Sequence, residues 1–238
     1  GFNSSVPKSD RLRQVSIIRY ADDFVIIHES YEVVLACKNF VSEWLKDNAG
    51  LSLSEAKTNI VKSGNGFEFL GFQFISITEK ETGKTKCRAS VSAKSKKRLI
   101  SKVHSVLQKH RSSTQETLIK TLNPIIVGWC NYYCVHECSK DFKQVEGTIF
   151  KMLEAWAKRR AANGMGVETV MKKYFNTEEN HEVKFRGKTH KPKWIFGTMS
   201  KTRSGTDKFI FLALPSWVTS KRHLKIKGKA SPFDKDTV

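Results

Sequence analysis

The feature that most constrains the fold is a pair of adjacent carboxylates, Asp22 and Asp23, between two apolar runs at 15–20 and 24–27. Both runs are rich in residues that favour strands, and two such runs around a short polar break predict a β-hairpin. The two aspartates then occupy its turn. Carboxylates on a rigid turn are hard oxygen ligands for Mg²⁺, and pairs of such ions catalyse phosphoryl transfer. An ordinary solvated turn is the alternative, because aspartate is common in turns.

The charge balance points to a polyanionic partner. The 238 residues carry 42 lysines and arginines against 23 aspartates and glutamates, which gives a formal net charge of +19. Nucleic acid is the first candidate partner and a membrane surface is the second. No apolar run approaches the roughly 18 residues that a membrane-spanning helix needs, and no secretory signal peptide is visible. We therefore expect no membrane partner and a protein that is not secreted, located in a bacterial cytoplasm or an organellar matrix.

The five cysteines agree with such a compartment, because an odd number without a secretory context predicts reduced thiols. Three of them, Cys130, Cys134 and Cys138, recur at four-residue intervals, which would place them on one face of a helix. Zinc sites generally need closer cysteine pairs or a fourth ligand. We therefore expect buried packing for these thiols and keep a metal site as the lesser alternative.

Between the hairpin and residue 90 the pattern mixes helix and strand. Apolar residues at three- and four-residue spacing predict a helix that Ser30 caps and Gly50 ends. Residues 67–74 predict an arm of a second hairpin, and 79–86 reads as a polar turn. The helix is expected to cover the back of a sheet and to carry no chemistry.

Three further amphipathic helices, at 92–109, from 114 and at 141–160, suggest a helical bundle. Pro124 lies inside the second pattern and implies a break or a kink. The bundle's aromatic side chains at helical spacing are expected in its core rather than as platforms for bases. These side chains are Trp129, Tyr132 and Trp156.

Beyond residue 161 the pattern changes again. Residues 167–175 predict a short helix, and 183–186, 193–196 and 209–212 predict short strands among basic loops. The first 14 residues read as a basic loop or tail, and those from 221 onward read as a flexible basic tail.

The acidic hairpin also carries a family resemblance. Tyr20, Ala21, Asp22 and Asp23 resemble the palm motif of reverse transcriptases, and the string 19–25 resembles the form found in group II intron-encoded proteins. The resemblance implies that Asp22 is a catalytic metal ligand and that Asp23 supports the same acidic site. It places Tyr20 close to this site, with packing at the base of the hairpin as the alternative. The small Ala21 would leave room for nucleic acid.

Two further motifs follow along the chain. Residues 50–61 resemble the next reverse transcriptase block, although Ala56 stands where a glutamate is usual. In that block Lys57 would lie near the primer and the incoming nucleotide; a solvated cation is the alternative. The resemblance also implies a primer grip formed by Phe69, Leu70, Gly71 and Phe72.

The helical region resembles the thumb, or domain X, of group II intron maturases, in residues 122–133 and in the closing string 156–160. Such a thumb implies binding of the template–primer duplex and of the intron RNA. A basic patch is expected to contact phosphates, although any single member is as well explained as a solvated cation. Its members are Lys94, Lys96, Lys97, Arg98, Lys158, Arg159 and Arg160.

The predicted fold class is α+β: part of a right-hand polymerase palm, with an antiparallel sheet and a helix, followed by a helical thumb bundle and a small basic C-terminal module. The expected boundaries are a basic loop at 1–14, palm at 15–90, thumb at 91–162, DNA-binding module at 163–220 and tail at 221–238. The module resembles the DNA-binding segment of these proteins. Nothing in it resembles a His-Asn-His endonuclease, so none is predicted.

The expected activity is RNA-directed DNA polymerisation by two-metal nucleotidyl transfer, with intron RNA binding that assists splicing and target-primed insertion (retrohoming). The expected partners are group II intron RNA, a template–primer duplex, dNTP and target DNA. Two Mg²⁺ ions would be held by Asp22, Asp23 and an acidic residue outside this sequence.

Activity is expected only with the family's upstream fingers and palm blocks, which these residues do not include, whether in the same reading frame or as a separate fragment. Two alternatives stay open. One is a non-enzymatic RNA-binding splicing cofactor. The other is a general basic nucleic-acid-binding protein, which leaves the ordered motifs unexplained.

Overall fold

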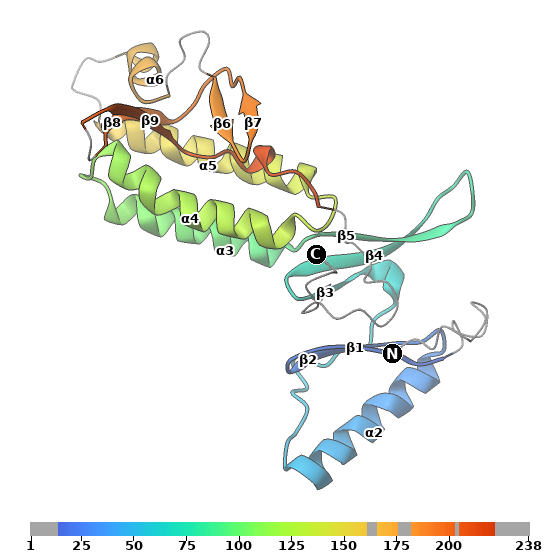
Figure 1. The fold of residues 1–238 in the computed structure, drawn as a ribbon. Coiled ribbons are helices and arrows are strands. Elements are labelled where there is room, and N and C mark those ends of the chain that lie inside the picture. The colour runs from blue at the N-terminus through green and yellow to red at the C-terminus, as the bar shows by residue number, and fades with distance from the viewer. Residues whose placement is uncertain (1–13, 161–165, 176–181, 203–204, 222–238) are drawn as a thin grey trace, which may run out of the picture. The chain divides into compact units, whose positions relative to one another are not determined.

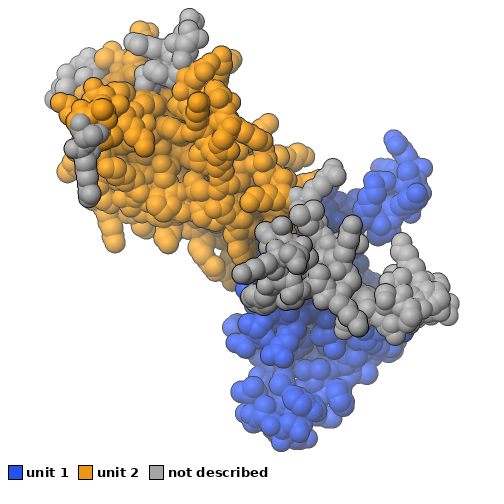
Figure 2. All heavy atoms as spheres, viewed as in Figure 1, with its two compact units in different colours: residues 1–89 blue, residues 90–238 orange. Residues whose placement is uncertain are grey.

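The computed structural model describes residues 14–160, 166–175, 182–202 and 205–221. The chain forms two compact units, residues 1–89 and residues 90–238 (Figure 2). Helices and antiparallel strands both occur in the described residues, which confirms the α+β class. Most of the predicted N-terminal loop and nearly all of the predicted basic tail lie outside the described residues.

Unit 1 begins with the predicted acidic hairpin. Strand β1 (Ser16–Tyr20) pairs antiparallel with β2 (Asp23–Ile27). Helix α2 (Tyr31–Ala49) follows, and its N-cap and C-cap are the predicted residues. The Ser30 hydroxyl accepts a hydrogen bond from the Val33 amide, and Gly50 takes the left-handed conformation with φ 62°.

A three-stranded sheet completes unit 1, with strand order β3 (Phe67–Phe69), β4 (Phe72–Thr78) and β5 (Thr85–Val91). A short 3₁₀ turn, η1 (Ser63–Asn65), precedes it. Strand β5 was not predicted, because most of its side chains are exposed and carry no apolar alternation. An ion pair of 2.6 Å between Lys86 and Glu79 helps to fix it beside the end of β4.

Unit 1 buries little of its apolar surface. Among its described residues Phe72 alone is buried, and α2 has no buried residue. Ile17, Tyr20 and Phe40 are 62%, 65% and 67% exposed. A two-stranded hairpin is only marginally stable in water unless further strands or a helix cover it. Unit 1 therefore contains enough apolar side chains to form a core, but most of them are exposed.

Unit 2 is built on the three predicted helices α3 (Ala93–Lys109), α4 (Gln115–Tyr133) and α5 (Ser139–Arg160). Figure 1 shows them packed side by side, and α3 contacts both α4 and α5. Fully buried Leu118, Leu122 and Phe142 form its centre. No helix in the described residues is long and apolar enough to cross a membrane.

Helix α4 continues without interruption through Pro124. This excludes the break, one of the two predicted effects of Pro124, whereas the kink stays a prediction. Proline removes one amide donor from the helical ladder, a cost that tertiary packing can offset. Residues on both sides of the proline, Leu122 and Ile126, are buried at 0% and 1% exposure, so packing holds the helix in place on either side.

One buried carboxylate fastens the start of the bundle. Asp141, in the first turn of α5, accepts hydrogen bonds from the Val91 amide at 3.0 Å and from Lys96 Nζ at 2.9 Å. Lys96 also donates to Gln144. The carboxylate thus ties the end of β5 and the first turn of α3 to α5. A second polar contact, from Tyr133 Oη to Ser95 Oγ at 2.8 Å, joins α4 to the same region.

The C-terminal segment adds a helix and two hairpins. Helix α6 (Val167–Phe175) has the predicted bounds. Strand β6 (Val183–Phe185) pairs with β7 (Lys188–His190), and β8 (Gly197–Lys201) pairs with β9 (Asp207–Phe211). The predicted strand at 193–196 is wrong: it is an irregular segment whose Ile195 and Phe196 are completely buried. Its apolar residues are apolar because they pack in the core, and not because they belong to a strand.

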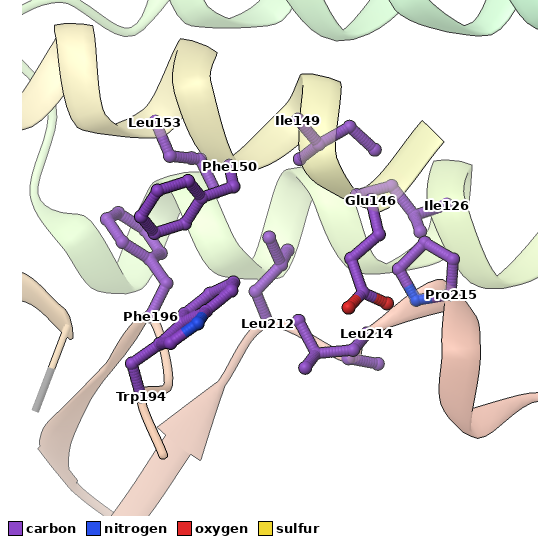
Figure 3. Close-up of a pocket in the computed structure, with 11 residues that line it drawn as sticks. Ile126, Glu146, Ile149, Phe150, Leu153, Trp194, Phe196, Leu212, Leu214 and Pro215 are labelled. Carbon is purple, nitrogen blue, oxygen red and sulfur yellow. The ribbon is translucent and has the colours of Figure 1, made fainter. Parts of the chain in front are cut away.

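This segment packs onto the bundle within unit 2. The Asn123 side chain of α4 brackets the end of β9, donating to the Phe211 carbonyl at 2.8 Å and accepting from the Ala213 amide at 2.9 Å. Figure 3 shows the seam, where Phe150 and Leu153 of α5 face Trp194 and Phe196. Its cavity measures about 10 Å³, which leaves room for one water molecule at most. The seam is a packed core and not a ligand site.

The three clustered cysteines are buried, as predicted, but they do not share a helix face. Cys130 lies in α4, Cys134 is its C-cap residue, and Cys138 precedes α5. Burial raises the pKa of the Cys130 thiol to about 12, and it also raises the pKa of Cys138. The burial of all three side chains supports the predicted packing role.

Of the three bundle aromatics predicted in the core, Trp156 is buried at 5% exposure and Trp129 is partly buried. Tyr132 is 52% exposed, so its prediction is wrong. It lies one position from buried Tyr133, whose ring it meets edge-on at 4.7 Å, and adjacent helical positions face different directions.

We expect Asp141→Ala to lower the free energy of unfolding of unit 2 by about 2 to 3 kcal/mol, because the Lys96 ammonium and the Val91 amide lose their shared acceptor. Asp141→Asn keeps an acceptor for the amide and should cost less. Urea denaturation measures both. The control is Asp207→Ala, at an exposed carboxylate on β9; a loss as large as that of Asp141→Ala in this control would contradict the assignment.

Native Cys130 should resist labelling by a thiol-specific disulfide reagent at pH 7 and still at pH 9. With a pKa of about 12 the thiol stays protonated throughout that range, and burial blocks access. Exposed Cys87 provides the internal comparison and should react quickly. Mass spectrometry locates the label. Labelling of Cys130 in the native chain as fast as Cys87 would refute the packing role.

Candidate active site

The turn of the acidic hairpin is two residues long. Tyr20 pairs with Asp23, so Ala21 and Asp22 alone connect the strands. Ala21 has φ 51°, a left-handed conformation that residues with a side chain rarely adopt. Such strain costs of order 1–3 kcal/mol and recurs at functional sites. Arg19 Nε donates to the Ala21 carbonyl at 2.8 Å and so braces the turn.

The two carboxylates differ in their setting. Asp22 lies in the turn, as predicted, whereas Asp23 is the first residue of β2. Both are exposed. In the part of the chain that the structure describes, neither side chain has a hydrogen-bond or ion-pair partner. Two unpaired carboxylates at one turn are available to a cation, in contrast to Asp141 in unit 2.

These carboxylates fit part of a magnesium site. Oxygen ligands are the donors that Mg²⁺ prefers, and the ion usually completes its octahedral shell with water and substrate phosphates. No group of three or more aspartate, glutamate, histidine or cysteine side chains that could hold a metal occurs among the described residues. Asp22 and Asp23 therefore provide an incomplete ligand set.

Tyr20 and Lys57, the two residues predicted to lie near this site, are both exposed. Tyr20 is 65% exposed, so it does not pack at the base of the hairpin. Lys57 lies in a turn whose amides at 57 and 58 donate to the Ser54 carbonyl. Within the described residues its ammonium has no ion-pair partner, and no ion pair joins it to either aspartate. Its predicted contact with phosphate stays a prediction.

The predicted primer grip forms a second tight hairpin. Phe69 pairs with Phe72, and the connecting residues Leu70 and Gly71 have φ 50° and 79°. Two positive φ angles define the turn type that matches the twist of a hairpin, with glycine in its second position. Phe72 is buried and Leu70 is partly buried. These four residues thus form the tight end of one hairpin.

The basic patch predicted in the thumb does not form one surface. Lys96 is tied to Asp141, at the N-terminal ends of α3 and α5. At the opposite ends, Arg160 donates to the Arg111 carbonyl at 2.6 Å and lies over the Trp156 ring. The α3 residues and the α5 residues of the patch thus lie at opposite ends of the bundle. Its exposed members without an ion-pair partner in the described structure are Lys94, Lys97, Arg98 and Arg159.

Sequence reasoning missed Arg19, the brace of the acidic turn. Its position directly before Tyr20 was the only signal available, and a basic side chain there reads equally well as solvated. The role depends on the chain reversing at Ala21, which brings the Ala21 carbonyl back within reach of the guanidinium.

Comparisons with known protein families match both units. Residues 4–74 match the family described as reverse transcriptase (RNA-dependent DNA polymerase). Residues 96–175 match the family described as group II intron, maturase-specific domain. A search of curated proteins gave no match. A reverse transcriptase match followed by a maturase-specific match confirms the predicted resemblance to group II intron-encoded reverse transcriptases/maturases.

Proposed function

We propose that this chain carries the acidic turn and the thumb of a reverse transcriptase that copies RNA into DNA. The observation that carries the proposal is the pair of unpartnered carboxylates, Asp22 and Asp23, on a strained and braced hairpin turn. The reverse transcriptase match over residues 4–74 includes this hairpin. In the proposed enzyme, unit 1 is part of a polymerase palm.

In the proposed reaction the primer 3′-oxygen forms a bond to the α-phosphorus of a dNTP, and the bond to pyrophosphate breaks. Mg²⁺ ions bound at the site would lower the pKa of the primer hydroxyl and neutralise charge on the leaving pyrophosphate. Asp22 and Asp23 would hold these ions together with a third acidic ligand from outside the described residues. Lys57 would contact phosphate near them, and the hairpin at 69–72 would position the primer strand.

The uncovered apolar surface of unit 1 supports a need for further palm structure. Ile17 and Ile18 of β1 are 62% and 47% exposed, as Phe40 of α2 also is at 67%. Burying apolar area of this kind is the main driving force for association of protein elements. We propose that upstream palm and finger segments cover this surface and bring the missing acidic ligand.

The maturase-specific match supports the second half of the proposal, binding of group II intron RNA by unit 2. The exposed cations of α3 and α5 provide phosphate contacts at both ends of the bundle. RNA bound there would be stabilised in its folded form for splicing. The same complex would use target DNA as primer during intron insertion, with the segment after α5 contacting that DNA.

A second candidate function is a splicing cofactor without polymerase activity. One observation favours it: the described residues provide only two carboxylates at the acidic turn and no complete metal cluster. In this case Asp22 and Asp23 hold no catalytic metal, and the chain acts through RNA binding alone.

The discriminating experiment is Mg²⁺-dependent primer extension on an RNA template, with the chain alone and with the upstream portion of its reading frame. We expect extension only when both are present. Asp22→Ala should reduce it at least about a hundredfold, because a metal ligand is lost. The matched control is Asp47→Ala, which removes an exposed carboxylate from α2 of the same unit and should leave extension unchanged.

Two outcomes would count against the polymerase. Extension that survives Asp22→Ala would exclude this aspartate as a catalytic ligand. An absence of extension in every combination, together with salt-sensitive binding of the intron RNA, would leave the splicing cofactor as the function.

A further inference from the structure

Unit 2 contains a groove that neither the acidic turn nor the predicted patch includes. Its volume is about 610 Å³, within the range of pockets that enclose small ligands. It lies where the end of α4 meets the β6–β7 hairpin and the chain after η2 (Pro215–Trp217). The groove is lined by Asn131, Phe185, Arg186, Lys188, Trp217, Thr219 and Lys221.

Ring contacts and a backbone hydrogen bond support the walls of the groove. The Trp217 ring stacks on His190 of β7, with centroids 4.5 Å apart and planes at 19°, and it also meets Phe185 and Phe211. The Lys221 amide donates to the Cys134 carbonyl at 2.6 Å, which ties this end of the chain to the end of α4. The aromatic wall is therefore fixed from several sides.

Arg186 occupies an unusual position at the rim. It forms the two-residue turn of the β6–β7 hairpin with Gly187, and the two residues have φ 52° and 75°. Asparagine or glycine is the preferred first residue of such a turn, and an arginine there costs backbone strain. Its guanidinium donates to Asn131 Oδ1 and lies near the Phe185 ring. The strained turn thus holds the Arg186 guanidinium at the rim of the groove.

The charged side chains that line the groove are all positive. It is lined by three cations, and none of the lining residues is acidic. Within the described residues, Lys188 and Lys221 have no ion-pair partner. The neighbouring ion pair of Lys191 with Glu182 leaves both of them free. Several cations grouped around one cavity favour a ligand that carries several phosphates.

We propose that this groove binds the phosphodiester backbone of an unpaired nucleic-acid strand, with Arg186, Lys188 and Lys221 as phosphate contacts. The proposal rests on the proposed function insofar as the chain acts on nucleic acid. It adds a site that clamps single strand, separate from the helical thumb surface. A duplex presents its phosphates on a stiff cylinder and meets only the rim, whereas an unpaired strand bends into a cavity.

The test is binding of fluorescein-labelled 12-nucleotide oligouridine and oligothymidine to the full chain, followed by anisotropy over a salt series. Arg186→Asn is the informative variant. It creates the favoured asparagine–glycine turn, so thermal stability should be unchanged or higher. Binding of the single strand should weaken about tenfold, and the salt dependence should fall by about one counterion. Lys188→Gln should act in the same direction.

The matched control is Lys184→Gln, which removes one charge from β6 of the same hairpin without touching the groove lining. It should leave single-strand affinity within about twofold. A 12-base-pair duplex should bind more weakly than the single strand and lose little affinity in Arg186→Asn. Comparing the affinities for oligouridine and oligothymidine shows whether the groove prefers an RNA or a DNA backbone.

Three outcomes would overturn the groove assignment: equal loss in Lys184→Gln, equal loss for the duplex, or no loss in Arg186→Asn. If that last result came with salt-sensitive binding of intron RNA, the proposed function would survive without the groove. Binding of an acidic peptide in preference to either oligonucleotide would identify a protein partner instead and would also overturn the assignment.

Discussion

Three tight hairpin turns position the side chains on which the proposed chemistry depends. The non-glycine residues with positive φ among the described residues are Ala21, Leu70 and Arg186, and each begins a two-residue turn between paired strands. Each departure from favoured backbone geometry costs of order 1 kcal/mol or more. In exchange, each turn fixes the position of particular side chains. The first turn carries the acidic pair, the second carries an aromatic loop, and the third carries the Arg186 guanidinium.

The two units support their turns in different ways. In unit 2, the Asp141 carboxylate and the Asn123 bracket fix the bundle and the C-terminal hairpins, and the seam of Figure 3 is tightly packed. In unit 1, Phe72 is the one buried side chain among the described residues. The hairpin with the acidic pair therefore has a defined turn but an exposed sheet, which is the physical basis of the proposal that further palm segments surround it.

Local patterns predicted most of the secondary structure, because caps and periodicity act over a few residues. Ser30 and Gly50 defined α2, and the apolar spacing defined the bundle helices. Features set by distant contacts could not be predicted in this way. The segment at 193–196 was predicted as a strand because its side chains are apolar, and they are apolar because they are buried. The basic residues were predicted as one patch because the sequence does not show that the start of α3 and the end of α5 lie at opposite ends of the bundle.

The same distinction applies to the candidate site. Asp22 and Asp23 stood out because two carboxylates between strands are rare in so basic a chain. The groove at Arg186 was missed because its lining comes from three separate segments, at 131, 185–188 and 217–221, which tertiary packing alone brings together. Short motifs were enough to recognise the family resemblance, whereas the proposed groove could be found only from the fold.

The central claim is that the acidic turn holds a divalent cation. Its most direct test is a titration with Mn²⁺, as a paramagnetic substitute for Mg²⁺, observed through the backbone amide signals of the isotope-labelled chain. The account predicts that broadening starts at the amides of residues 20–24 and disappears in Asp22→Ala. Broadening that spreads evenly over the other exposed carboxylates, or that persists around the turn in Asp22→Ala, would contradict it.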